Sequence, residues 1–122
     1  MKKLILFIAG LFIVSCSSKT SDVAAFQFGG AWYNVVNFQE GTSKAELEEY
    51  VKTYSNPEAT SYFFFYPENY DVSVFKKEKF NQLDFAATVV STNPTYGMYR
   101  MMPADKTVHD DAVWLMQQSI KE

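Results

Sequence analysis

The segment SYFFFYP, Ser61–Pro67, restricts the fold more than any other part of this sequence. Alternate side chains of a strand point to opposite faces of its sheet, so this strand would carry rings on both faces. One face would hold Tyr62, Phe64 and Tyr66, and the other Phe63 and Phe65. A strand that is apolar on both faces is normally central, with a layer on each side.

Two interpretations of these rings fit the sequence. In the first, all of them belong to the core and are covered on both faces. In the second, helices cover one face only, and the other is an exposed apolar patch of the kind that marks a binding surface. Because the hydroxyls of Tyr62 and Tyr66 need water or a partner, their face is the better candidate for a partner-binding surface.

The segments before this strand carry clear signals. Residues 31–38, AWYNVVNF, are rich in aromatic and β-branched side chains and are predicted to form a strand. Ser43 and Glu46 have the spacing of a capping box, which begins a helix. That helix is expected to end before Asn56-Pro57.

The region from residue 83 to residue 102 is predicted to be a hairpin. Leu83–Val90 alternates in the manner of a strand, Asn93-Pro94 initiates a turn, and Tyr96–Met102 returns. A helical interpretation of Phe80, Leu83, Ala87 and Val90 competes with the first of these strands. The preceding residues 68–82 are less defined, with Asp71–Phe75 as a candidate short strand.

The last predicted element is a helix that runs to about Lys121. Thr107 and Asp110 repeat the capping-box spacing at its start. The resulting order is strand, helix, strand, hairpin and helix. This order predicts an α+β fold, a small two-layer sandwich with a mostly antiparallel sheet and two helices, formed by one domain over residues 29–122.

The N-terminal segment has the composition of an export signal. Lys2 and Lys3 precede an uncharged apolar run of eleven residues, Leu4–Val14. A helix that crosses a bilayer needs about 20 such residues, so this run is too short to span one. A positive start, a short apolar run and a small residue before the cleavage site are typical of a secretory signal.

The residues Ile13-Val14-Ser15-Cys16 resemble the lipobox of bacterial lipoproteins. The resemblance implies a signal peptide over residues 1–15, acylation of Cys16, and a flexible tether to residue 28. It also implies export and attachment to the membrane through acylated Cys16, where more than one acyl chain gives stable anchoring. The same resemblance implies the outer rather than the inner membrane, because Ser17 stands where some lipoproteins carry an aspartate that keeps them in the inner membrane. An ordinary signal with an incidental cysteine is the alternative.

Composition excludes several classes of function. Loss of Lys2 and Lys3 with the signal leaves 9 basic against 14 acidic residues, a net charge of about −5. This balance argues against a nucleic-acid partner, whose recognition starts from a basic patch. Acylation of Cys16, the only cysteine, leaves no disulfide, cysteine nucleophile or thiolate metal ligand.

Trp114 breaks the pattern of the last helix. The apolar residues of this helix fall within an arc of about 160°, and Trp114 lies opposite them, among polar residues. Such a ring is either covered by a loop or tail, or it contacts something outside the domain. Because tryptophan is enriched in interface hot spots, Trp114 is a candidate partner-binding residue.

Arg100 is the only arginine. On the return strand it would share a face with Tyr96 and Met98, and its planar fork suits a carboxylate or phosphate. It is therefore a candidate anion-binding residue. The favoured alternative is a cross-strand pair with Asp84.

His109 adjoins Asp110 and Asp111, a combination that can bind zinc or manganese. Successive helical side chains diverge by about 100°, and acidic residues in a first turn are explained by capping and the helix dipole. We therefore predict no metal site, and we expect neither a cofactor nor enzymatic activity because no catalytic constellation is visible.

The sequence leads first to a lipid-anchored envelope protein that binds a protein partner. One alternative is a periplasmic small-ligand binding module that uses Arg100 and tyrosines. A small hydrolase is the third hypothesis.

Overall fold

The computed structural model describes residues 20–76, 80–101 and 107–121, which form four strands and three α-helices. Their order is β1 (Thr20–Phe28), β2 (Ala31–Phe38), α2 (Lys44–Tyr54), β3 (Ser61–Pro67), the 3-10 helix η1 (Ser73–Lys76), α3 (Gln82–Thr92), β4 (Tyr96–Arg100) and α4 (Ala112–Lys121). The predicted α+β class is therefore confirmed, with one more helix than expected.

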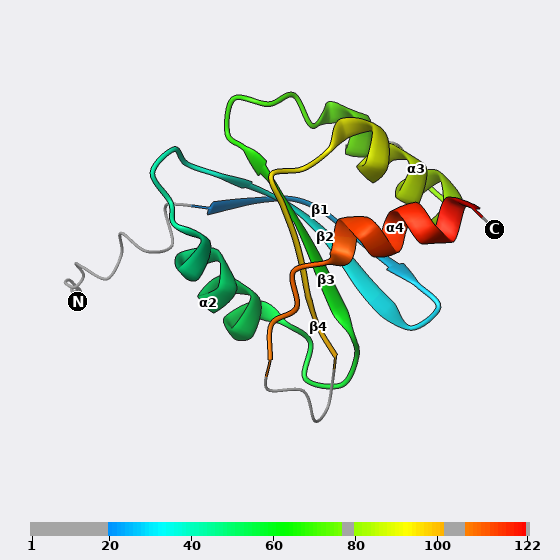
Figure 1. The fold of residues 1–122 in the computed structure, drawn as a ribbon, viewed down its shortest axis with the longest axis horizontal. Coiled ribbons are helices and arrows are strands. Elements are labelled where there is room, and N and C mark those ends of the chain that lie inside the picture. Colours follow the sequence, from blue (N-terminus) through cyan, green and yellow to red (C-terminus); the bar gives the residue numbers. More distant parts are fainter. Residues whose placement is uncertain (1–19, 77–79, 102–106, 122) are drawn as a thin grey trace, which may run out of the picture.

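One mixed sheet organises the molecule, with strand order β1-β2-β3-β4. The pairs β1–β2 and β3–β4 are antiparallel, and β2–β3 is parallel. Antiparallel pairing is thus in the majority, as predicted. The parallel pair arises because helix α2 lies between β2 and β3 in the chain and carries it back to the opposite end of the sheet (Figure 1).

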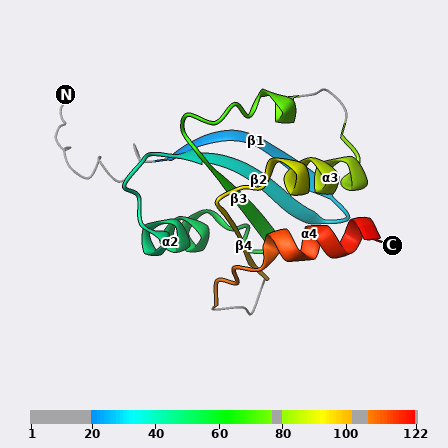
Figure 2. The same ribbon diagram turned by 45° about the horizontal axis from the view of Figure 1, so that its top comes forward.

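Strand β3 is central, and helices cover both of its faces. Phe64 and Tyr66 pack in the cluster that α3, α4 and η1 cover, whereas Phe63 and Phe65 pack with Leu47 of α2. Figures 1 and 2 show α2 on one side of the sheet and α3 and α4 on the other. The predicted two-layer sandwich is therefore corrected to three layers, because a strand that is apolar on both faces needs a cover on each.

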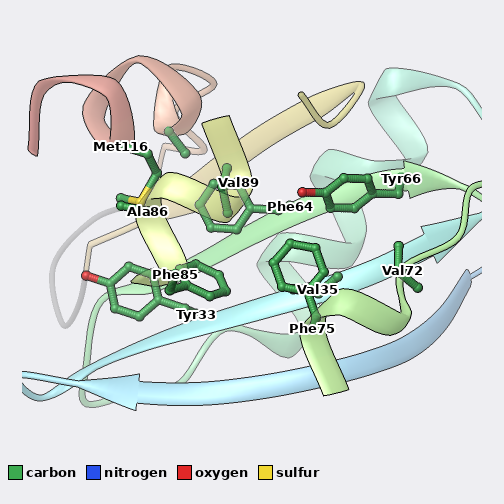
Figure 3. Close-up of a cluster of buried hydrophobic side chains, with 11 residues drawn as sticks. Tyr33, Val35, Phe64, Tyr66, Val72, Phe75, Phe85, Ala86, Val89 and Met116 are labelled. Carbon is green, nitrogen blue, oxygen red and sulfur yellow. The ribbon is translucent and has the colours of Figure 1, made fainter. Parts of the chain in front are cut away.

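The larger cluster contains most of the aromatic core. Phe85 of α3 lies at its centre, with ring centroids 5.7 Å from both Phe64 and Phe75 and 5.4 Å from Tyr33. Figure 3 shows these side chains gathered between the sheet and the helices. Aromatic pairs at these separations add to the stabilisation that burial gives. The first interpretation of the SYFFFYP rings, as core, therefore describes most of them.

Residues 82–92 are helix α3 and not the first strand of a hairpin. The side chain of Asn81 accepts a hydrogen bond from the backbone N–H of Asp84, and Asn93 ends the helix in the left-handed conformation with φ 53°. Phe85, Ala86 and Val89 are buried while Leu83 is exposed, which is helical spacing. The competing helical interpretation was correct about the helix but not about its buried face, since Leu83 and Ala87 are exposed. Strand β4, predicted as the return strand, pairs with β3 instead.

Strand β1 occupies residues that the sequence assigned to a tether. Thr20–Phe28 pairs with β2 through a turn at Gly29-Gly30, whose positive φ values of 59° and 84° favour glycine. Phe26 and Phe28 pack against the core cluster, which explains why the segment is ordered. The tether prediction is therefore wrong for residues 20–28, and residues 16–19 lie outside the described part.

The two predicted capping boxes differ in outcome. That of Ser43 and Glu46 is present at the start of α2, with both hydrogen bonds formed. The one predicted at Thr107 and Asp110 is wrong, because α4 begins only at Ala112. Residues 71–75, the candidate short strand, hold part of η1.

Candidate functional site

Trp114 lies on the face of α4 that points away from the sheet, and 56% of its surface is exposed. Ala112 and Met116 of the same helix are buried beneath it. Trp114 therefore faces outward, as its position opposite the apolar arc of the helix predicted. An indole that remains exposed on a helix anchored by its opposite face can contact another molecule without disturbing the core.

Tyr62 is half-buried in a row of rings that crosses the sheet. Its ring centroid lies 4.7 Å from that of Tyr33 on β2 and 5.2 Å from that of Tyr99 on β4. Tyr99 in turn stacks on His109 at 4.7 Å. Burial, with a smaller contribution from the charge of Asp111, raises the pKa of the Tyr62 phenol. Tyr62 is therefore only partly exposed, and its hydroxyl stays neutral at ordinary pH.

Tyr66 does not lie on the surface. Its side chain is fully buried, and its hydroxyl shares a 2.7 Å hydrogen bond with Thr92 Oγ1 at the end of α3. Burial raises the pKa of this phenol well above its usual value. Its assignment as a partner-binding residue is corrected, because α3 and η1 cover the face of β3 that was expected to be open.

Arg100 faces helix α2. Its guanidinium Nη1 donates a 3.2 Å hydrogen bond to the carbonyl oxygen of Lys52 in the last turn of that helix. Asp84, the expected cross-strand partner, belongs to α3 and not to a strand, so the predicted cross-strand pair is wrong. Arg100 and Tyr62 lie on opposite faces of the sheet, since Arg100 is in register with Ser61. The two side chains therefore do not line one pocket.

His109 is part of a short antiparallel bridge rather than of α4. Its backbone exchanges two hydrogen bonds of 2.8 Å with Tyr99. Asp110 instead pairs with Lys44 Nζ at 2.7 Å, which lowers the pKa of the carboxyl. In the described part of the chain, no three histidine, cysteine or acidic side chains form a group that could hold a metal.

A hollow of about 610 Å³ opens where the parallel strands β2 and β3 end. It is lined by Phe38 and the following Glu40 and Gly41, by Pro67 with Glu68 and Asn69, and by Thr95 before β4. This volume lies within the range of about 300–1,000 Å³ that is usual for small-ligand pockets. The sequence analysis did not identify this site.

The position of the hollow has a topological cause. The chain leaves β2 towards α2 on one face of the sheet and leaves β3 towards η1 and α3 on the other (Figure 1). Loops that diverge in this way from the ends of adjacent parallel strands open a crevice in which ligands commonly bind. In the same loop as Glu40, the Oγ1 atom of Thr42 is buried and has no hydrogen-bond partner.

The signal for this site was present in the sequence. Polar residues follow each of the two strands directly, as Gln39-Glu40-Gly41 and as Glu68-Asn69. The sequence analysis did not connect these two segments. A strand–helix–strand order makes the two strands parallel and brings these residues together, which would have indicated the hollow.

Cys16 and the rest of the lipobox lie outside the described residues. Among the residues that are described, no helix is long and apolar enough to cross a membrane. Comparisons of this chain with protein-family models, curated proteins and solved structures find no match.

Proposed function

We propose that this chain is a lipid-anchored protein of the bacterial envelope whose domain binds a protein partner through helix α4. The observation that carries the proposal is Trp114, which is 56% exposed on a helix whose opposite face is packed into the core. A large ring held in that position is available for contact and loses little side-chain freedom on binding.

The neighbourhood of Trp114 suits a protein partner better than a small molecule. Gln117 is exposed and Gln118 partly exposed on the same helix, so the indole is surrounded by polar groups that can form the rim of an interface. A convex helix face offers no enclosure, whereas small ligands are usually held in concave sites. The lipobox resemblance supplies the anchor, through Cys16.

The experiment is co-purification after crosslinking in intact cells. Tagged wild type is compared with Trp114→Ala and with Tyr54→Ala, a matched control because Tyr54 is 59% exposed on α2, in the other helical layer. We expect one envelope protein to accompany wild type and Tyr54→Ala and to be lost with Trp114→Ala. Recovery of the same protein with all three would place the contact elsewhere and contradict the proposal.

A further inference from the structure

Trp32 is the second tryptophan that the core does not use. In the described part of the chain, Trp32 and Trp114 are the only aromatic side chains whose rings pair with no other ring. Trp32 lies on β2 and is partly buried, yet it packs in neither of the two buried clusters. The packing of the core therefore does not account for a tryptophan at this position.

The register of the strands gives Trp32 three neighbours on one face of the sheet. Trp32 and Asn34 share the face of Val36, which packs with α2, because they precede it by four and two residues. Gln27 of β1 lies directly opposite Trp32, and Ala25 directly opposite Asn34. Opposite side chains lie about 5 Å apart and successive rows about 7 Å apart, so these four side chains form one surface, the Trp32 patch.

Helix α2 does not cover the Trp32 patch. The helix reaches β1 at Asp22, whose carboxylate accepts a hydrogen bond from the Tyr50 hydroxyl. Farther along β1, Ala25 and Gln27 are exposed. This face of the sheet is therefore open near the hairpin that joins β1 to β2.

The polar groups of the patch are free to bind a ligand. Within the described residues, neither the Trp32 indole N–H nor the Gln27 amide forms a hydrogen bond. Thr42 Oγ1 is the one buried side-chain polar atom without a partner in that part of the chain, so the indole N–H is open to solvent. Asn34 Nδ2 donates a 3.1 Å hydrogen bond to the Tyr62 carbonyl oxygen, which holds the amide and leaves its own oxygen as an acceptor.

A neutral sugar matches this combination of groups. A pyranose ring carries C–H groups on one face, which stack on an indole, and hydroxyls at its rim, which exchange hydrogen bonds with amides. None of the four side chains is charged, so neither a cation nor an anion gains an ionic partner in the patch. A single ring among amides is also more polar than the core of a protein interface.

We propose that the Trp32 patch binds a neutral saccharide, with one sugar ring stacked on the indole and its hydroxyls bonded to Gln27 and Asn34. The patch lies on the face of the sheet that α2 packs against, whereas α4 packs on the other face (Figure 1). The saccharide site is thus separate from the surface around Trp114. It depends neither on the lipid anchor nor on a partner at α4.

Tryptophan fluorescence tests this site directly, because the chain has two tryptophans. Trp32 is the sole tryptophan of full-length Trp114→Phe, and Trp114 that of Trp32→Phe. Both variants are titrated with cellotetraose and with chitotetraose in a detergent that carries no sugar. We expect at least one oligosaccharide to change the emission of Trp114→Phe in a saturable manner, and neither to change that of Trp32→Phe. No change in Trp114→Phe, or the same change in both variants, overturns the proposal.

Calorimetry with the same oligosaccharides tests the polar contacts without replacing a tryptophan. Gln27→Ala should weaken binding by about fivefold relative to wild type, because a hydrogen bond to the sugar is lost. Gln117→Ala, at an exposed glutamine of α4, is the matched control and should bind as wild type does. Absence of binding by wild type, or equal affinities in Gln27→Ala and wild type, contradicts the proposed arrangement.

Co-purification after crosslinking separates a saccharide site from a second protein interface. The envelope protein expected to accompany wild type should also accompany Trp32→Phe. Its loss with Trp32→Phe would make the patch part of the protein interface and overturn the assignment to a saccharide. If no protein accompanies wild type, the proposed function fails, while the titrations still decide whether the patch binds a sugar.

Discussion

Trp114 is the side chain on which the proposed function depends most. The rings of the core are buried, whereas the indole of Trp114 is exposed, because helix α4 packs through Ala112 and Met116 on its opposite face. Tyr66 shows the opposite case, since its ring is enclosed and its hydroxyl is satisfied by Thr92. The environment of each ring, and not its residue type, therefore decides whether it can bind a partner.

Replacement of Trp114 by alanine should leave the fold intact. Because the indole is 56% exposed, we expect the free energy of unfolding to change by no more than about 0.5 kcal/mol. Thermal melts followed by circular dichroism measure this. A loss of about 2 kcal/mol or more would mean that the ring is part of the core, and would remove the basis of the proposed function.

Gly97 allows α4 to approach β4 closely. A Cβ atom at this position would lie 2.8 Å from Val113 Cγ2 and 3.1 Å from the Val113 backbone nitrogen. We therefore expect Gly97→Ala to destabilise the domain by about 1–3 kcal/mol in urea unfolding, as overpacking does. In the double variant with Val113→Ala the two effects should be less than additive, because the closest contact is removed. Strict additivity would show that the helix does not rest on Gly97.

Helix α3 is the element whose assignment changes the fold most, since it provides Phe85 at the centre of the core. Leu83, two residues earlier, is 59% exposed. In the strand interpretation both side chains would point to the same face. The pair thus distinguishes the two interpretations by experiment.

Phe85→Ala should cost about 3–5 kcal/mol of unfolding free energy, because it leaves a cavity among several rings. Leu83→Ala should cost no more than about 0.5 kcal/mol. Denaturant unfolding of both variants gives the comparison. Similar large losses in both would indicate that Leu83 is buried as well and would contradict the helix.

The ion pair between Lys44 and Asp110 connects the start of α2 to the segment before α4, and it should contribute to stability only above the acid range. The pair lowers the pKa of the Asp110 carboxyl in the folded state. Its contribution is therefore present above the unfolded value of about 3.9 and is lost as pH falls through the lower folded value. We expect the unfolding free energies of wild type and Lys44→Met to differ at pH 7 and to converge near pH 2. A difference that persists at acid pH would argue against this pair as its cause.

The elements differ in how far the sequence could predict them, and the reasons are physical. Ser43 and Glu46 act within one helical turn, so the start of α2 was predictable from local spacing. Leu83–Val90 fits both periods, and the packing of Phe85 against Phe64, far away in the chain, is what the local alternation could not reveal. The burial of Tyr66 likewise depends on α3 and η1, which were not predicted. The hollow required the parallel pairing of β2 and β3 to be recognised first.

At the scale of the whole molecule, the three layers give the domain two distinct ends. The start of β1 and the hollow lie at one end, and the Gly29-Gly30 hairpin lies at the other. If Cys16 is acylated, as we propose, the short connection of residues 17–19 would bring this end of the domain towards the membrane.

The anchor itself gives a simple prediction. Cys16→Ala removes the site of acylation, so metabolic labelling with palmitate should be abolished and the protein should move from the membrane to the soluble fraction. Ser17→Ala is the matched control, because it leaves the acylated residue in place. Unchanged membrane fractionation of Cys16→Ala would contradict a lipid anchor at this position.

The most direct test of a membrane-anchored binding domain is photo-crosslinking from position 114 in intact cells. A photoreactive phenylalanine derivative replaces Trp114, which the exposed site can accept, and in a second strain it replaces Tyr54. We expect one adduct with an envelope protein from position 114, absent from position 54 and lost with Cys16→Ala. No adduct from position 114, or the same adduct from both positions, would contradict it.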